Sequence, residues 1–227
     1  MIEISNVNKK YHSKANEEVV AIDGINLKFN HNGLVFILGK SGSGKSTFLK
    51  AVALNLICAQ SLMTTFSQSF KSPFYKVLSS MALKDDLKTQ QSYFMVEIAS
   101  LNRIVNEPQD IKVFGFIDEI LRGTNTLERI AASSTILHQL SQSNKMFMAA
   151  THDIELTRIL DNDVKNIHFS ETFVQDDLEF DYQVKHGPSQ TRNAIKLLEI
   201  NGYDAQIIQK ANELLKEFEM SRKWEQF

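Results

Sequence analysis

The sequence of 227 residues is 43% apolar and 23% charged, which is typical of a soluble globular chain large enough to bury a hydrophobic core. Its 25 Lys and Arg residues nearly balance 27 Asp and Glu residues, and the formal net charge of −2 excludes the overall basic excess of a nucleic-acid-binding module. We expect a cytoplasmic chain without a membrane span, disulfide or zinc site, because long apolar runs and an apolar signal core are absent and Cys58 is the single cysteine.

The first part of the sequence predicts an antiparallel β-lobe. Residues 2–4 and 18–29 alternate apolar and polar side chains, which is the period of strands with one exposed face. A turn cluster at 30–33 is followed by the unbroken apolar run 34–38, typical of a strand covered on both faces in a parallel sheet. Residues 47–59 contain no helix breaker and predict a buried helix.

The middle of the sequence alternates helices and strands. Apolar residues recur at helical spacing from Phe94 to Val105, and the pattern stops at Pro108. Apolar runs at 113–117 and 145–150 predict two further strands, each followed by a helix. The expected helices lie at 127–141 and from Asp153 onward. This order predicts an α/β fold with a mainly parallel central sheet flanked by helices.

The last part of the sequence predicts an antiparallel edge and C-terminal helices. Residues 164–169 and 178–184 have the pattern of edge strands. Helices are expected at about 190–198 and 204–218. The second helix places six apolar side chains on one face, namely Ile207, Ile208, Ala211, Leu214, Leu215 and Phe218.

Residues 39–46, GKSGSGKS, match the phosphate-binding pattern G-x-x-x-x-G-K-[ST] between a predicted strand and a predicted helix. Glycines let backbone N–H groups turn toward phosphate oxygens, and the helix N-terminus adds partial positive charge. Lys45 would reach the β- and γ-phosphates, and Ser46 would ligate Mg²⁺. The alternative, a chance glycine turn, is disfavoured by the flanking strand and helix. The expected nucleotide contacts here are Gly39, Ser41, Gly42, Ser43, Gly44, Lys45, Ser46 and Thr47.

Two acids follow the strand predicted at 113–117. Asp118 would hold Mg²⁺, directly or through water, and Glu119 would orient or deprotonate the attacking water. Acids after a strand are otherwise common as exposed loop residues, but the upstream Gly-rich motif favours the catalytic interpretation. The expected catalytic residues are Lys45, Glu119 and His152, and the expected metal ligands are Ser46 and Asp118.

His152 follows the third apolar strand, so it would reach the γ-phosphate or its water from the same edge of the sheet. The alternative is that Asp153 caps the next helix and His152 has no catalytic part.

Two family resemblances are carried by different segments. The first 47 residues resemble the nucleotide-binding domain of ABC transporters in IEISNVNKKY (2–11), AIDGINL (21–27) and LGKSGSGKST (38–47). In that family an aromatic residue at the position of Tyr11 stacks on adenine. From residue 48 onward the sequence resembles the ATPase domain of the MutS mismatch-repair family. The matching segments are SYFMVE (92–97), IDEILRGTN (117–125), ATHD (150–153) and GPSQTRNA (187–194).

The placement of glycine separates the two resemblances. No glycine lies between Gly44 and Gly115, so the glycine-containing signature that ABC domains carry in this interval is absent. In the MutS resemblance, Ser92 takes that part and reaches the γ-phosphate on the opposite subunit. The resemblance further implies that Asn125 acts across the same interface.

The phosphate-binding loop follows the ABC pattern, because MutS proteins usually carry Asn-Met where this sequence has Ser41-Gly42. We therefore interpret the chain as a chimera, engineered or recombinant, that forms one domain over residues 1–227. Its expected parts are an ABC-like β-lobe and loop (1–47), a MutS-like ATPase core (48–185) and a C-terminal helical dimerisation element (186–227).

These resemblances imply a P-loop NTPase fold and Mg²⁺-dependent ATP hydrolysis by a homodimer with ATP at its interface. Nucleic-acid binding by this chain alone is not expected, because the mismatch-reading segments of MutS proteins are missing. A rival hypothesis is ATP binding without hydrolysis, since a γ-phosphate misplaced by about 1 Å lowers the rate roughly 10²-fold. The sequence also leaves open an ABC-transporter motor subunit, which only residues 1–47 favour, and a folded chain with no selected activity.

Overall fold

The structure, a computed structural model, divides the chain into two compact units. The larger unit is Met1–Glu171 with Phe180–Ser189, and the smaller is Thr172–Glu179 with Gln190–Phe227. The described residues are 1–12, 18–81, 93–160, 164–174, 177–188 and 194–221.

The larger unit is built on a six-stranded sheet in the order β5-β6-β7-β3-β8-β9. Its first five strands pair in parallel, and β9 follows β8 at the edge. The structure thus confirms an α/β fold with a mainly parallel sheet. The strands are β3 (Gly33–Leu38), β5 (Lys76–Ser80), β6 (Val113–Asp118), β7 (Met146–Thr151), β8 (Val164–Val174) and β9 (Asp177–His186).

Both strands predicted for the edge exist, as β8 and β9, which are neighbours in the sheet. The sequence pattern did not show that β8 also pairs in parallel with β3, with Leu34 opposite Val164. A helix, α4 (Ile154–Ile159), intervenes between β7 and β8. A crossover through a helix returns the chain in the same direction, which makes the next strand parallel.

A second sheet, in the order β2-β1-β4, is antiparallel. It contains β1 (Ile2–His12), β2 (Glu18–Phe29) and β4 (Ser69–Lys71), and Ile2 lies opposite Phe29. The structure confirms the β-lobe predicted from residues 2–4 and 18–29. The sequence patterns did not reveal β4 and β5, because β4 has only three residues and β5, KVLSS, contains only two apolar residues and so forms no apolar run.

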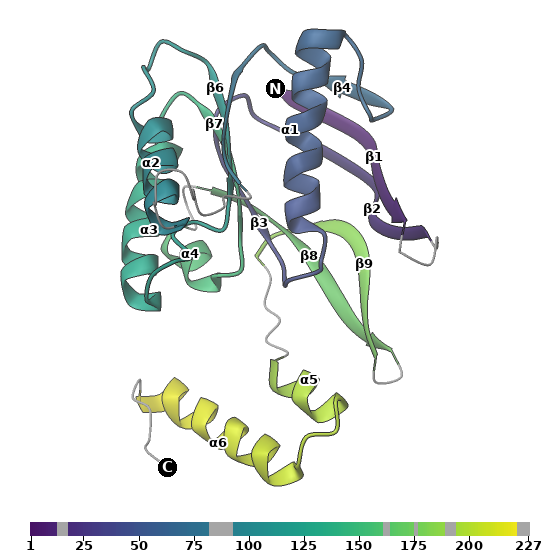
Figure 1. The fold of residues 1–227 in the computed structure, drawn as a ribbon, viewed down its shortest axis with the longest axis vertical. Helices are drawn as coiled ribbons and strands as arrows, with labels where there is room; N and C mark the ends of the chain where they lie inside the picture. Colours follow the sequence, from purple (N-terminus) through teal and green to yellow (C-terminus); the bar gives the residue numbers. More distant parts are fainter. Residues whose placement is uncertain (13–17, 82–92, 161–163, 175–176, 189–193, 222–227) are drawn as a thin grey trace. The chain divides into compact units, whose positions relative to one another are not determined.

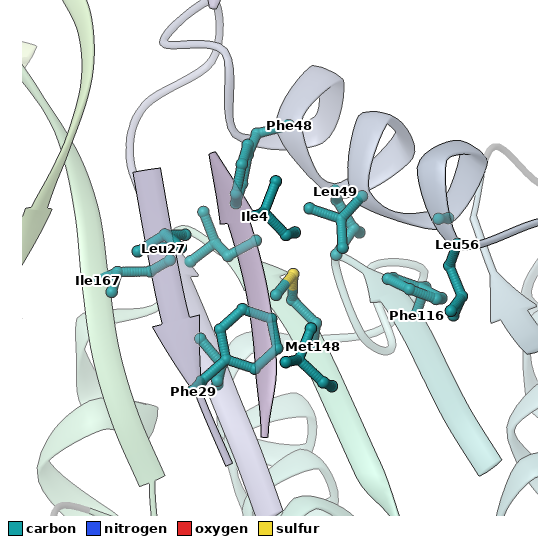
Figure 2. Packing of buried hydrophobic residues seen from close by; sticks show 14 of the residues in the cluster. Ile4, Leu27, Phe29, Phe48, Leu49, Leu56, Phe116, Met148 and Ile167 are labelled. Carbon is teal, nitrogen blue, oxygen red and sulfur yellow. The ribbon is translucent and has the colours of Figure 1, made fainter. Parts of the chain in front are cut away.

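Helices cover both faces of the six-stranded sheet (Figure 1). On one face, α1 (Lys45–Leu62) and the antiparallel sheet enclose a core that includes Phe48, Phe116 and Met148 (Figure 2). On the other face, α2 (Tyr93–Val105), α3 (Thr126–Ser141) and α4 enclose a second core. Strands covered on both faces need apolar residues at every position, which explains the unbroken apolar runs.

The smaller unit contains two helices, α5 (Ala194–Ile200) and α6 (Ala205–Ser221), that contact each other. They agree with the predicted helices at 190–198 and 204–218, although residues 190–193 lie outside the described part. None of their described residues is buried, and Ile207 is 51% exposed. In the described part of the chain, no helix is long and apolar enough to cross a membrane.

Candidate functional site

The Gly-rich loop, residues 39–44, connects β3 to α1. Gly44 occupies the N-cap of α1 with a left-handed φ of 98°, and a Cβ there would lie 2.6 Å from the carbonyl oxygen of Ala21. Only glycine fits this position without strain or a backbone clash. The N-terminal amides of α1 therefore begin directly after a tight turn, as an anion-binding loop requires.

A pocket of about 720 Å³ opens beside this loop, and we call it the phosphate-side pocket. It brings together most of the residues expected to bind phosphate and metal, together with the start of β2 and two tyrosines. The lining residues are Val19, Val20, Ala21, Ser41, Gly42, Gly44, Lys45, Ser46, Thr47, Tyr93, Asp118, Glu119, Arg122, Gly123 and Tyr182.

Side chains from the first turn of α1 meet the two acids at the end of β6. The Lys45 Nζ lies 3.1 Å from Glu119 Oε1, and the Ser46 hydroxyl donates a hydrogen bond of 2.9 Å to Asp118 Oδ1. The side chains of Lys45 and Glu119 are 6% and 16% exposed, so the pair is shielded from water. The carboxyl ends of parallel strands share one edge of the sheet, which explains how residues more than 70 positions apart come together.

Three basic side chains surround the carboxylate of Glu119. Besides Lys45, His152 Nδ1 lies 3.3 Å from Oε1 and Arg122 Nη1 lies 3.6 Å from Oε2. The hydrogen bond to His152, and then Lys45, lower the pKa of Glu119 to about 2, although burial acts in the opposite direction. The same hydrogen bond raises the pKa of His152. Glu119 is therefore ionised at neutral pH and is a weak proton acceptor.

The backbone around Glu119 is strained. Glu119 and Leu121 have φ values of 58° and 55°, left-handed conformations that cost about 1–3 kcal/mol each for residues other than glycine. The Glu119 amide donates a hydrogen bond of 2.9 Å to the Ala150 carbonyl, and the Leu121 amide donates to a carboxylate oxygen of Glu97. The surrounding fold thus holds this loop in a conformation that it would not adopt alone.

Asp153, the acid of the ATHD segment, has a partner other than the helix cap that was considered for it. Asp153 occupies the N-cap of α4, but its side chain makes no cap hydrogen bond. Instead, Arg129 of α3 donates to both of its carboxylate oxygens, at 3.0 and 2.8 Å. His152 is 47% exposed, with Nε2 3.7 Å from Asp153 Oδ1. The alternative of an Asp153 side-chain cap is therefore not what the structure shows.

Tyr11 lies outside the phosphate-side pocket. It lines a neighbouring cavity of about 470 Å³, which we call the Tyr11 groove, together with Lys50 and Leu54. Lys9 Nζ lies 4.8 Å above the Tyr11 ring, and Tyr11 is 47% exposed. Thr47 lines both cavities, so the groove and the phosphate-side pocket are neighbours.

The remaining expected site residues either do not line the phosphate-side pocket or lie outside the described residues. Gly39 and Ser43 do not line the phosphate-side pocket, and the buried hydroxyl of Ser43 has no hydrogen-bond partner among the described residues. Asn125 caps α3, its side chain accepting a hydrogen bond of 3.0 Å from the Glu128 amide. Ser92 lies outside the described residues.

Several residues that shape the site were not predicted from the sequence. Tyr93, Tyr182 and Arg122 line the pocket, and Glu97 and Arg129 hold its loops. Arg122 and Glu97 fall within the segments IDEILRGTN and SYFMVE, which offered a signal for them. Nothing local marks Arg129, because its partner is 24 residues away.

The oxygen atoms of the site suit Mg²⁺, which proteins hold through few side chains of their own, better than a metal ion held by side chains alone. A hydroxyl and a carboxylate, from Ser46 and Asp118, lie within hydrogen-bond distance of each other. Mg²⁺ is usually held by one or two such groups together with phosphate oxygens and water. Among the described residues, no three His, Cys, Asp or Glu side chains gather to form a metal cage.

Comparison with known proteins identifies the family. The family model for MutS domain V matches residues 35–219, and the chain belongs to this family. DNA mismatch repair protein MutS of Thermus thermophilus is 28% identical over 183 residues, 80% of this chain and 22% of that protein. The MutS proteins of Fusobacterium nucleatum and Streptococcus uberis are 30% and 29% identical, covering 83% and 87% of this chain. These alignments cover 21% and 24% of the two proteins, so the chain spans about a fifth of the length of these relatives.

These comparisons confirm the MutS resemblance and change the interpretation of the loop. The matched range begins at residue 35, so the Gly-rich segment 39–46 lies inside the MutS match. The three MutS relatives give no support for an ABC lobe or for a junction near residue 47. A strand–loop–helix of this kind occurs in both families, so its residues alone do not distinguish them.

Proposed function

We propose that this chain is a P-loop ATPase that binds ATP with Mg²⁺ and hydrolyses it. The observation that carries the proposal is the meeting of Lys45 and Ser46 with Glu119 and Asp118 in one pocket beside a glycine loop. Membership of the MutS domain V family supports it. Because the match covers about a fifth of each relative, we carry over the nucleotide chemistry and not the recognition of DNA.

The phosphates would be held by Lys45 and by the N-terminal amides of α1. An ammonium has three donors, so Lys45 can bind phosphate oxygen while it keeps its contact with Glu119. Ser46 and Asp118 would hold Mg²⁺, which neutralises phosphate charge when bound.

Glu119 would orient the attacking water rather than accept its proton at the outset. Its pKa of about 2 makes it a weak base, but an ionised carboxylate in a fixed position is a strong hydrogen-bond acceptor. His152 would help to hold Glu119 in place, through its hydrogen bond to Oε1.

The adenine base would lie against Tyr11. Thr47 lines both cavities, which allows one extended ligand to reach from Lys45 to the Tyr11 groove. Tyr182, which lines the phosphate-side pocket itself, is the competing stacking residue. Separate substitutions of the two tyrosines distinguish these placements.

We further propose that the active form is a homodimer with ATP at the interface, in which Ser92 and Asn125 act on the partner's site. The half-exposed Ile207 on α6 supports a role for residues 186–227 in dimerisation, because an amphipathic helix with an exposed apolar side gains stability by being covered.

The direct test is calorimetric titration of the chain with ATP and Mg²⁺, with its mass measured in solution alongside. Lys45→Ala should weaken binding about 10- to 100-fold, the value of a hydrogen bond to a charged group. Lys40→Ala is the matched control, because Lys40 belongs to the same loop but pairs with Glu171, 3.4 Å away, outside the pocket. Undiminished affinity in Lys45→Ala would contradict the proposal.

Binding without hydrolysis is a second candidate, favoured by the engagement of Glu119 with both Lys45 and His152. Such a protein would bind ATP tightly and release no phosphate at any protein concentration. Hydrolysis that rises with dimer formation would select the ATPase instead.

A further inference from the structure

Glu97 is a buried acid that the proposed chemistry does not use. It lies on α2 and is 2% exposed, and one carboxylate oxygen accepts a hydrogen bond from the Leu121 amide. Burial raises the pKa of Glu97, while hydrogen bonds from the amides of Leu121 and Arg122 act against that rise. Its second oxygen, Oε2, is buried without a hydrogen-bond partner in the described part of the chain. A buried carboxylate with so few partners requires an explanation.

The residues that Glu97 holds form the loop 119–123, which directly follows β6. Two of its non-glycine residues, Glu119 and Leu121, have left-handed backbones. Such a loop relaxes to ordinary angles unless outside contacts fix it.

A second contact from α2 fixes the end of the same loop. A Cβ at Gly123 would lie 2.9 Å from a ring carbon of Phe94, so the backbone here packs directly on that ring. Glu97 and Phe94 are three residues apart, on one face of the helix. The two side chains therefore hold the middle and the end of the loop whose first residue is Glu119.

We propose that Glu97 is a positioning residue that fixes the loop 119–123 so that the Glu119 carboxylate faces Lys45 and His152. This inference rests on the proposed ATPase function for its catalytic consequence. Removing the acceptor leaves the Leu121 amide, in a residue that is 6% exposed, without its partner. The loop is then free to move Glu119 away from the phosphate-side pocket, while Lys45 and the Gly-rich loop stay in place.

The structural part is tested by hydrogen exchange of the intact chain, without nucleotide. In Glu97→Ala, the amides of 119–123 should exchange at least about tenfold faster. The local opening that exposes these amides no longer has to break the hydrogen bond between the Leu121 amide and the Glu97 carboxylate. In Glu97→Gln, which keeps one carbonyl acceptor, the increase should be smaller. Glu107→Ala is the control, because that buried acid pairs with Lys76 beside the opposite end of β6. Unchanged exchange at 119–123 in Glu97→Ala would overturn the proposal.

The catalytic part is tested by steady-state ATP hydrolysis. Glu97→Ala should lower kcat about 10²-fold and leave KM for ATP nearly unchanged, because a displacement of about 1 Å of a catalytic group has this effect. Glu97→Gln should restore most of the rate. In a Glu119→Gln background, adding Glu97→Ala should have no further effect, because the two residues act through one group.

The outcomes separate the two proposals. A wild-type chain that binds no ATP and releases no phosphate overturns the proposed function, while the exchange data still decide whether Glu97 holds the loop. A hydrolysing wild type with multiplicative effects in the double variant overturns the positioning role alone. If Glu97→Ala does not fold, Glu97→Gln carries the test: a smaller but measurable rise in exchange at 119–123 supports the positioning role, and wild-type exchange there overturns it.

Discussion

The phosphate-side pocket and the Tyr11 groove are neighbours that share Thr47, yet their charged residues differ in how far they are exposed to solvent. In the pocket, Lys45 is 6% exposed and contacts Glu119 at 3.1 Å. In the groove, Lys10 contacts Glu18 at 2.7 Å, but both side chains are more than half exposed. Exposed pairs contribute at most about 1 kcal/mol, whereas shielded charges hold fixed positions. The comparison indicates shielded charges in fixed positions in the phosphate-side pocket and solvent-exposed charges beside the Tyr11 groove.

The largest effect should come from the pocket's central acid. Glu119→Gln keeps the shape of the side chain but removes its charge, so kcat for ATP hydrolysis should fall about 10²- to 10⁴-fold. ATP affinity should change little, because the Gly-rich loop and Lys45 remain. Phosphate-release assays measure the rate, with Glu107→Gln as the control acid. Equal rates in wild type and Glu119→Gln would remove the distinction between a catalytic pocket and a binding groove.

The rigidity of the pocket is tested at Gly44. Gly44→Ala should destabilise the fold by about 2–4 kcal/mol, because a left-handed φ and a clash with the Ala21 carbonyl act together. Gly33→Ala is matched, since Gly33 has a φ of 101° but nothing within 4 Å of its Cβ position, and should cost about 1–2 kcal/mol. Urea denaturation of the two variants gives the difference. Equal losses would show that the loop yields to the extra methyl group.

Substitution of the two tyrosines tests whether the base lies in the Tyr11 groove or in the phosphate-side pocket. Tyr11→Ala should weaken ATP binding about tenfold, because stacking on a base contributes roughly 1–3 kcal/mol. Tyr182→Ala should have a smaller effect if the base lies in the Tyr11 groove. Titration with ATP and with inorganic triphosphate, which has no base, gives the readout. A larger loss for Tyr182→Ala would place the base in the phosphate-side pocket.

The smallest effect is the pH dependence of stability. The pKa of Glu119 is lowered from 4.5 to about 2, so its contribution is present above about pH 4.5 and is lost as the pH falls toward 2. The pKa of His152 is raised from 6.5, so its contribution is present below 6.5 and is lost as the pH rises through the raised value. The ion pair is therefore complete between about pH 4.5 and 6.5.

Because His152 is 47% exposed, we expect this pair to contribute only on the order of 1 kcal/mol. We expect urea denaturation of the wild type and of Glu119→Gln from pH 3 to 9 to show a difference in the free energy of unfolding. This difference should be largest between about pH 4.5 and 6.5. Identical pH profiles for the two chains would show that solvent screens the pair completely.

The sequence predicted the long elements well, because each carries its own pattern. The run at 34–38 and the helix after Gly44 appear in the structure as β3 and α1. Short elements failed for the same reason, since β4 has only three residues. The expectation for Lys45 and Ser46 came from a motif whose geometry is local, so the sequence placed these residues at the pocket.

The direction of β8 and the contacts Glu97–Leu121 and Arg129–Asp153 were decided by the tertiary structure alone. Each joins segments that are distant along the chain, and no local propensity encodes such a meeting. The sequence by itself determined which residues could form a strand, a helix or a phosphate-binding turn, because those depend on neighbours a few positions away. Packing decided that Glu119 faces Lys45 and that the Glu97 carboxylate accepts a hydrogen bond from the Leu121 amide. The reason is that burial leaves each polar group only the partners that the fold brings within reach.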